Sequence, residues 1–291
     1  MWGKGEIMDL KGKTAFVTGA ASGIGRGMAR TFARHGMTVA LADIQEAPLE
    51  EARREAESLG ARAIAIPTDV SDRASVQRAA ERVIAAFGKV YVVCNNAGVE
   101  VAGKKIGEFR PDEWDWVLGV NLYGVIHGVE IFLPLIQSHG EGGHIVNTAS
   151  IAGLQVRHDF FHAPYVVAKY GVVALSEALA GELAGSNIGV SVLCPAAVDT
   201  KIWDTGKTRP ARFGGPLDQP NNLFLQPILE REGLHPDQVG ERVVRAIRDN
   251  ELFVLTHDGP RATVTARHRR IEQAFDRAAQ FEAGFAPRKN R

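Results

Sequence analysis

The chain has 291 residues, of which 45% are hydrophobic and 23% are charged, a balance typical of a globular protein. Its 34 basic residues equal its 34 acidic ones, which argues against a dedicated nucleic-acid surface and gives no electrostatic reason to bind a membrane. No uninterrupted apolar run would span a bilayer, and the N-terminal residues lack the apolar stretch of a secretory signal. The two cysteines, Cys94 and Cys194, lie in separate strand-like runs, so we expect reduced, buried thiols in a cytoplasmic protein.

Strand-like and helix-like segments alternate along most of the chain. The expected strands are residues 13–18, 38–42, 61–66, 90–94, 144–149, 189–193 and 252–255. The expected helices are residues 25–35, 47–59, 73–87, 111–137, a helix that contains Tyr165 and ends near Leu183, 236–248, and a charged tail from Arg261 that frays by Pro287. This alternation indicates βαβ units, hence an α/β fold with a parallel sheet covered by helices on both faces.

A glycine-rich segment joins the first strand to the first helix. It reads Thr18-Gly-Ala-Ala-Ser-Gly-Ile-Gly25. Glycines at such a junction let the backbone approach a pyrophosphate, and the helix N-terminus offers free N–H groups and a positive dipole end. A tight turn without any ligand is the alternative. The residues expected at a dinucleotide here are Gly19, Ser22, Gly23, Ile24 and Gly25.

Asp43 follows directly on the second strand. A carboxylate at this point can accept hydrogen bonds from both hydroxyls of an adenosine ribose, and it would repel a 2′-phosphate. No lysine or arginine stands at Ala21, Ser22, Ile44 or Gln45 to receive such a phosphate. The sequence therefore favours NAD over NADP.

Polar and small residues also follow the third and fourth strands. Asp69 and Val70 stand where an adenine edge would lie, although Asp69 could instead cap the next helix, as could Ser71. The segment that closes the fourth strand puts small residues where the cofactor backbone would pass: Asn96, Ala97 and Gly98.

Tyr165 and Lys169 are four residues apart on one expected helix, so they share a face of it. A free tyrosine has a pKa near 10, and a fixed cation beside it favours the phenolate. Making tyrosine a base at neutral pH takes about 4 kcal/mol of differential stabilisation. Ser150, at the end of an apolar strand, could contact the same substrate oxygen.

The chain resembles the single-domain, NAD-dependent branch of the short-chain dehydrogenase/reductase family over roughly residues 10–255. The matching features appear in family order: the glycine segment, Asp43, Asp69-Val70, Asn95–Gly98, Asn121, Ser150, Tyr165, Lys169 and the turn Pro195–Thr200. The resemblance implies a seven-stranded, doubly wound Rossmann sheet, hydride transfer with NAD, and usually a homotetramer, with a dimer as the alternative. It implies one domain over residues 1–291, with a substrate lid at about 200–235 and a helical extension at about 259–291.

The resemblance also assigns roles. Tyr165 is the acid/base, Lys169 lowers its pKa and holds the nicotinamide ribose, Ser150 orients the substrate oxygen, and Asn121 holds a water in the proton relay. Cofactor contacts are implied after the sixth strand, at Pro195, Val198 and Thr200.

Two features depart from the family pattern. The usual glycine after Pro195 is Ala196, whose methyl group calls for a small adjustment near the nicotinamide. Fourteen residues separate Ser150 from Tyr165 where about a dozen are common in the family, and we expect the extra length to bulge over the substrate.

Large apolar residues in this insertion and in the lid suggest the substrate. Phe160, Phe161 and Trp203, with the cluster Leu223-Phe-Leu225, would form a broad apolar pocket for a bulky hydrophobic, alicyclic or aromatic secondary alcohol or ketone. Packing against a neighbouring subunit is the alternative for these residues. His158, Asp159 and His162 have no further metal-ligand partners in the loop, so no metal is expected.

Two other functions stay open at this point. A dinucleotide-binding sensor or scaffold would be expected to have lost Ser150, Tyr165 or Lys169, and this chain keeps all three. A dehydratase or epimerase usually needs a longer chain. The sequence therefore favours an NAD-dependent alcohol dehydrogenase or ketoreductase.

Overall fold

The computed structural model describes residues 8–218, 224–283 and 285. The chain forms two compact units, Met1–Thr256 and His257–Arg291. The prediction of one Rossmann domain with a helical extension stays a prediction.

A parallel sheet forms the centre of the first unit. Among the described residues its seven strands are β1 (Thr14–Thr18), β2 (Thr38–Asp43), β3 (Ala63–Pro67), β4 (Val92–Asn95), β5 (Gly143–Thr148), β6 (Ile188–Cys194) and β7 (Phe253–Leu255). Their order is β3-β2-β1-β4-β5-β6-β7, and every neighbouring pair is parallel. The predicted doubly wound parallel sheet is therefore confirmed, and its strand order reverses between β1 and β4.

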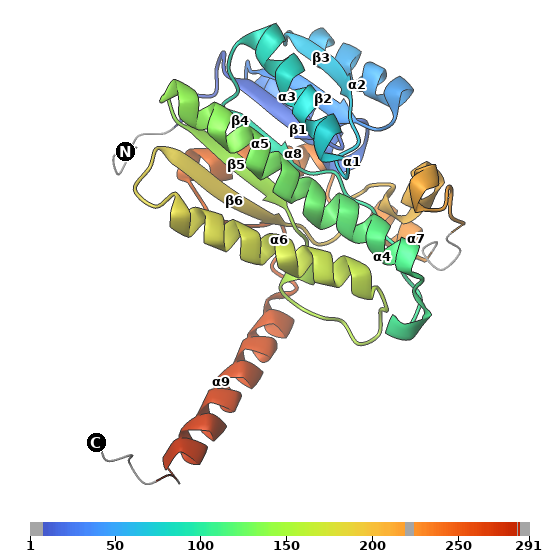
Figure 1. Ribbon diagram of the computed structural model, residues 1–291, viewed down its shortest axis with the longest axis vertical. Helices are drawn as coiled ribbons and strands as arrows, with labels where there is room; N and C mark the ends of the chain where they lie inside the picture. The colour runs from blue at the N-terminus through green and yellow to red at the C-terminus, as the bar shows by residue number, and fades with distance from the viewer. Residues whose placement is uncertain (1–7, 219–223, 284, 286–291) are drawn as a thin grey trace. The chain divides into compact units, whose positions relative to one another are not determined.

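Helices cover both faces of this sheet (Figure 1). The core on one face is shared by α1 (Gly23–Arg34), α2 (Glu46–Ser58) and α8 (Pro236–Asp249). The core on the other face is shared by α3 (Arg73–Phe87), α5 (Gly124–His139) and α6 (Ala163–Glu182). Strands buried on both faces explain why β1 and β5 are buried along their whole length. On the second face the rings of Phe16 and Phe132 stack with their centres 4.3 Å apart.

The helix predicted over residues 111–137 is longer and less regular than expected. It begins as α4 (Pro111–Leu118), widens into a π-helical turn, η2 (Gly119–Tyr123), and continues as α5. The Gly124 N–H bonds to the Gly119 carbonyl, five residues back. By length and composition the run Pro111–His139 could cross a membrane, but 56% of its most apolar window is buried inside the protein, as expected of a helix in a protein core.

The lid region contains short helices that the sequence did not predict. These are η4 (Ile202–Thr208), η5 (Ala211–Phe213) and α7 (Leu225–Glu232). The buried Arg209 anchors the lid to α4, because its Nη2 donates to Asp112 Oδ2 at 2.6 Å. Leu223, expected in the apolar lid cluster, lies outside the described residues.

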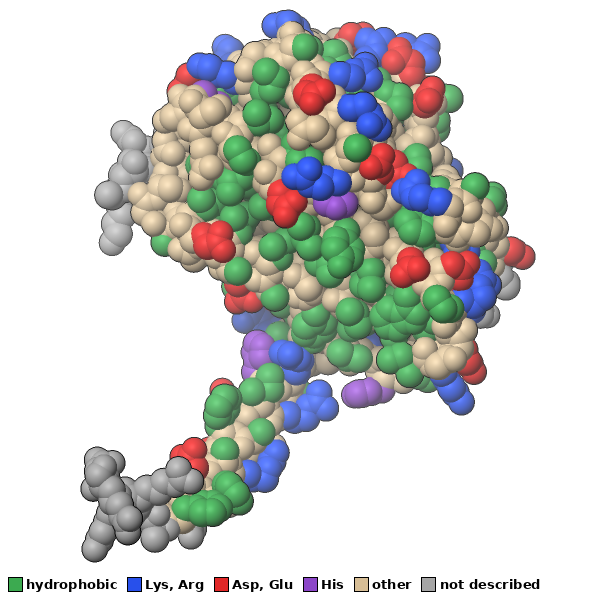
Figure 2. All heavy atoms as spheres, in the orientation of Figure 1, with side chains coloured by type: hydrophobic (Ala, Val, Ile, Leu, Met, Phe, Trp, Pro, Cys, Tyr) green, Lys and Arg blue, Asp and Glu red, His purple; other side chains and the backbone are tan. Residues whose placement is uncertain are grey.

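Hydrophobic side chains gather on the surface over α4, α5 and α6 (Figure 2). On these elements, Tyr123 in η2 is 54% exposed and Val167 in α6 is 49% exposed.

The second unit contains α9 (Arg261–Ala283), the helix predicted for the tail. Its exposed apolar side chains include Ile271, Phe275 and Phe281. Pro287, where fraying was expected, lies outside the described residues.

Candidate active site

A cleft runs along the carboxyl ends of six strands. Its lining includes residues that end or follow β1 to β6 in turn: Gly19, Asp43, Asp69, Asn96, Thr148 and Pro195. Open α/β sheets bind ligands at this edge, where the strand order reverses. The fold thus brings most of the sequence-predicted residues to one place.

The glycine segment forms a tight cradle at the start of α1. A Cβ on Gly25 would lie 2.2 Å from the Gly19 carbonyl oxygen, so only glycine fits there, while Gly19 and Gly23 have positive φ angles of 67° and 51°. Ser22 is the N-cap of α1, and its side chain makes no capping hydrogen bond. The first N–H groups of α1 therefore face a cleft lined by Ser22, Gly23 and Ile24, an arrangement that fits a pyrophosphate.

Asp43 lies at the end of β2, buried at the cleft wall. Its Oδ2 accepts from the Ala21 N–H at 3.1 Å, and its Oδ1 accepts from the Gln45 N–H at 3.0 Å. Burial raises the pKa of this carboxyl group, while the backbone N–H groups oppose the rise. Ile44 and Gln45 line the same part of the cleft, and neither is charged. The site fits an adenosine ribose without a 2′-phosphate.

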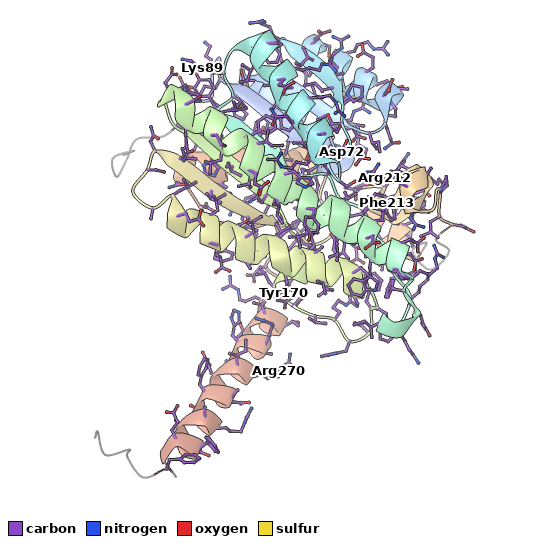
Figure 3. The ribbon with its side chains drawn as sticks, viewed as in Figure 1. Asp72, Lys89, Tyr170, Arg212, Phe213 and Arg270 are labelled. Atoms are coloured by element: carbon purple, nitrogen blue, oxygen red, sulfur yellow. The ribbon has the colours of Figure 1, made fainter. Side chains whose placement is uncertain are left out.

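Asp69 lines the cleft with Val70 but is also bonded to the lid. Its Oδ1 accepts from the Ser71 hydroxyl at 2.6 Å, and its Oδ2 accepts from Arg212 at 2.5 Å. Arg212 and Phe213 lie together close to the start of α3, which Asp72 marks in Figure 3. The cap of α3 is Asp72, which accepts from the Ala74 N–H, and is neither Asp69 nor Ser71.

Asn96 fastens the end of β4 to its neighbours. Its Nδ2 donates to the Thr18 carbonyl at 2.9 Å, and its Oδ1 accepts from the Thr148 hydroxyl at 3.2 Å. Ala97 and Gly98 then continue along the cleft. The side chain of Asn96 therefore fixes the path of the backbone that a cofactor would follow.

Tyr165, Lys169 and Ser150 come together at the far end of the cleft. Tyr165 is 8% exposed and hydrogen-bonds to Ser150, whose Oγ also accepts from the Ala152 N–H at 3.1 Å. Lys169 Nζ lies 5.4 Å from the centre of the Tyr165 ring and donates to the Thr148 carbonyl at 2.8 Å. Tyr165 and Lys169 line the cleft.

Asn121 lies in the π-helical turn η2 and is fully buried. Its side chain pairs with one residue of the loop after β4: the Val99 N–H donates to Oδ1 and Nδ2 donates to the Val99 carbonyl, both at 2.8 Å. Asn121 is therefore held against the loop after β4.

Burial dominates the ionisation of the central pair. It raises the pKa of Tyr165, Glu100 raises it further, and the hydrogen bond with Ser150 lowers it. The direction is opposite to the lowering expected from the sequence, because removing the phenolate from water outweighs the groups that favour it. Burial also lowers the pKa of Lys169 to about 8, and Glu100 opposes this change.

Two buried residues beside Tyr165 were not recognised in the sequence as site residues. Glu100 is 4% exposed, His162 is 7% exposed, and His162 Nδ1 lies 3.3 Å from Glu100 Oε1. The His162 ring stacks on the Tyr165 ring at 5.5 Å with an angle of 17°. The only available signal for Glu100 was a carboxylate two residues beyond Gly98, which ends the segment that closes β4.

The residues predicted to contact substrate do not line the cleft. The Phe160 ring packs at a tilt against His162 and meets Phe224 edge-on, Phe161 is 51% exposed, and Trp203 is half-buried in η4. The cleft is lined instead by Trp116, Val120 and Ile202, which share a hydrophobic cluster with Tyr165, and by Thr205, Thr208 and Pro210. Substrate contact by the three predicted residues stays a prediction.

In the turn after β6, some residues line the cleft and one is buried in the core. Pro195 and Thr200 line the cleft, whereas Val198 is buried and bridges to Leu234. The Ala196 N–H donates to the Thr256 hydroxyl at 3.2 Å, so the backbone at the unusual alanine is held in place.

The described part of the chain contains no group of three or more His, Cys, Asp or Glu residues arranged to hold a metal ion. Of the residues considered for such a site, Asp159 pairs with Arg157 and His162 pairs with Glu100.

Known proteins match both the sequence and the fold. The family model of short chain dehydrogenases matches residues 13–210. The C alpha-dehydrogenase of Sphingobium sp. strain SYK-6 is 34% identical over 254 residues, which cover 86% of this chain and 82% of that relative.

Solved structures agree. A short chain dehydrogenase/reductase from Burkholderia phymatum in complex with NAD has a TM-score of 0.88 and 38% identity, covering 92% of this chain and 97% of that one. The apo form of LigD from Sphingobium sp. strain SYK-6 has a TM-score of 0.76 and 30% identity, covering 96% and 100%.

Proposed function

The chain belongs to the short-chain dehydrogenase/reductase family of oxidoreductases, and on that premise we propose that it transfers a hydride between NAD and a bulky hydrophobic secondary alcohol or ketone, with Tyr165 as acid/base. One observation carries the proposal. The buried Tyr165, bonded to Ser150, lies in the same cleft as the glycine cradle and Asp43. A single cleft can thus hold a dinucleotide at one end and an alcohol at the other.

NAD is the cofactor that these residues suit. The start of α1 would bind the pyrophosphate, and Asp43 would accept hydrogen bonds from the adenosine ribose. The Burkholderia phymatum neighbour was solved with NAD, which supports the same cofactor here. When bound, NAD supplies the hydride acceptor and a positively charged ring.

The protein's part in the oxidation is to hold the alcohol and take its proton. Ser150 orients the alcohol oxygen, and the Tyr165 phenolate accepts the hydroxyl proton while the carbinol C–H leaves as hydride and a C=O bond forms. Lys169, held by the Thr148 carbonyl, is close enough to favour the phenolate. Reduction of a ketone runs the same steps in reverse.

Asn121 serves the same reaction through the proton path. Its amide is fixed to Val99 by two hydrogen bonds, which supports a fixed position for a relay water beside it. Loss of the Asn121 amide should therefore lower the rate of proton transfer during turnover, with a smaller effect on the affinity for the cofactor.

A bulky hydrophobic substrate is supported by the lining of the cleft near Tyr165. Trp116, Val120 and Ile202 present apolar surface there. One relative bears the name C alpha-dehydrogenase, which supports dehydrogenation at a carbon atom as the reaction.

Assembly and location belong to the same proposal. The apolar face over α4, α5 and α6, together with the exposed Tyr123 in η2 and Val167 in α6, supports association into a tetramer or dimer, which sedimentation would measure. Two free, buried cysteines support a cytoplasmic location, which cell fractionation would test.

Replacing Tyr165 by phenylalanine tests the proposal. Nicotinamide absorbance is followed with NAD and a panel of aliphatic, alicyclic and aryl secondary alcohols. We expect the wild-type protein to oxidise the bulky alcohols of the panel. Tyr165→Phe should oxidise them at least about 1,000-fold more slowly, while its affinity for NAD stays close to that of the wild type. Tyr91→Phe is the matched control. Tyr91 precedes β4, at the amino end of the strand, and its hydroxyl donates to Glu141. Undiminished turnover in Tyr165→Phe would show that another group is the base.

A further inference from the structure

A buried acid and a buried histidine lie beside Tyr165 and have no role in the reaction as written above. Glu100 comes from the loop after β4, and its N–H donates to the Thr205 hydroxyl at 3.1 Å. His162 is the N-cap residue of α6 and comes from the insertion between Ser150 and Tyr165. Burying both side chains has a desolvation cost, which their contact at 3.3 Å offsets.

The pair is connected to Tyr165 by ring packing. His162 stacks nearly parallel on the Tyr165 ring, and Phe160 packs against His162 with ring centres 4.1 Å apart. Phe224, at the start of α7, meets Phe160 edge-on at 5.2 Å. A row of four rings, Phe224, Phe160, His162 and Tyr165, therefore runs from the lid to the acid/base residue. Glu100 fixes the orientation of the His162 imidazole in this row.

Few charges act on Tyr165 from the elements packed around it. Glu100 acts on Tyr165 from the loop after β4, Lys169 lies on the same helix with its Nζ 5.4 Å from the centre of the Tyr165 ring, and Cys194 at the end of β6 acts on Lys169.

The carboxylates of α4, which packs against α6, have other partners or are exposed. Asp112 pairs with Arg110 and Arg209, Glu113 pairs with Lys104, and Asp115 lies at the surface. Glu100 is therefore the acid that opposes formation of the Tyr165 phenolate.

We propose that Glu100 and His162 act together as positioning residues, which fix the ring of Tyr165 and set the pH at which it accepts the substrate proton. The imidazole holds the phenol ring by stacking and satisfies the Glu100 carboxylate. The carboxylate in turn keeps Tyr165 protonated until higher pH. The inference rests on the proposed function of Tyr165, but its charge effect is measurable without turnover.

The test follows the ionisation of Tyr165 directly. The full chain, labelled with ¹³C-tyrosine and saturated with NAD, is titrated by NMR, and Tyr165→Phe identifies the signal. Glu100→Gln removes the charge, and we expect the midpoint to fall by roughly one pH unit. His162→Phe keeps the stacking but removes the imidazole that contacts the carboxylate, so the Tyr165 midpoint in this variant should rise. The double variant should behave as Glu100→Gln alone, because the histidine then has no charge to act on.

Controls separate this effect from general damage. Glu113→Gln replaces another buried glutamate, which pairs with Lys104, and should leave the midpoint unchanged. Glu100→Asp keeps the charge and guards against misfolding of Glu100→Gln, and its midpoint should not fall below that of the wild type. Where an alcohol of the panel is oxidised, the acid limb of kcat/KM should move with the NMR midpoint, about tenfold in rate per pH unit.

The outcomes distinguish this inference from the proposed function. A midpoint that fails to fall in Glu100→Gln, or single-variant shifts that simply add in the double variant, overturns the role of the pair. If no alcohol of the panel is oxidised but the NMR midpoints shift as expected, the proposed substrate class is contradicted and the role of Glu100 and His162 is supported.

Discussion

Asp43 offers the sharpest test of the cofactor assignment, through replacement by asparagine. Asparagine keeps the size of the side chain and one acceptor oxygen, but it removes the charge. The wild-type carboxylate uses one oxygen for the Ala21 N–H and the other for the Gln45 N–H. Both oxygens keep lone pairs for ribose hydroxyls, so each expected ribose contact is a charge-assisted hydrogen bond in the wild type.

The size of the effect follows from these contacts. A hydrogen bond to a charged acceptor contributes about 1 kcal/mol more than one to a neutral acceptor. Making both ribose contacts neutral should therefore weaken NAD binding by about 2 kcal/mol, or roughly 30-fold in the dissociation constant. A carboxylate about 4 Å from a 2′-phosphate would cost about 4 kcal/mol at an effective dielectric of 20, and asparagine removes that repulsion. Both changes act in the same direction, so the preference for NAD over NADP should fall by at least about 100-fold.

Calorimetric titration with NAD and with NADP measures both dissociation constants. Asp72→Asn, at the exposed N-cap of α3, is the matched control and should change stability without changing the cofactor ratio. Because burial raises the pKa of Asp43, the wild-type preference should also weaken as the pH is lowered, whereas the variant's should not. An unchanged ratio in Asp43→Asn would refute the ribose assignment.

Two further outcomes follow from the fold. Gly25→Ala should weaken NAD binding at least about tenfold in the same titration, because its Cβ would meet the Gly19 carbonyl at 2.2 Å, whereas Gly107→Ala, with open space around it, should bind normally. Burial lowers the pKa of His144 to about 3, below the unfolded value of 6.5, so the unfolded chain takes up the proton first as the pH falls. In urea unfolding, the free energy of unfolding should therefore fall by about 2 kcal/mol between pH 7 and pH 5 because of this residue. His144→Gln should lack this fall, and an equal pH dependence of stability in the two chains would contradict the prediction.

Much of the fold could be predicted because its strands are short apolar runs between helices of amphipathic pattern. The rule that parallel strands end at one edge then places Asp43, Asn96 and Ser150 together without any knowledge of distances. Tyr165 and Lys169 follow from the geometry of a single helix. These residues depend only on local pattern and on strand order.

Other parts depend on how loops fold over the sheet, which no periodicity reports. Glu100 and His162 are 62 residues apart in sequence, and only the packing of two loops brings them into contact. Trp203 was expected in the substrate pocket because it is a large aromatic residue in the lid, yet among the tryptophans that the structure describes it is Trp116, on α4, that lines the cleft. The pKa of Tyr165 was expected to be lowered because the sequence shows the neighbouring lysine but does not show the burial.

The π-helical turn η2 has a consequence for the phase of the helix that contains it. At about 100° of rotation per residue, a continuous α-helix would turn the buried side of α5, at Val129 and Phe132, roughly 140° away from the buried side of α4, at Trp116 and Val117. A five-residue turn absorbs one residue without its rotation and brings the two sides to within about 40° of each other. A single deletion between Gly119 and Tyr123 would undo this alignment, so the chain should tolerate substitutions there far better than any change in length.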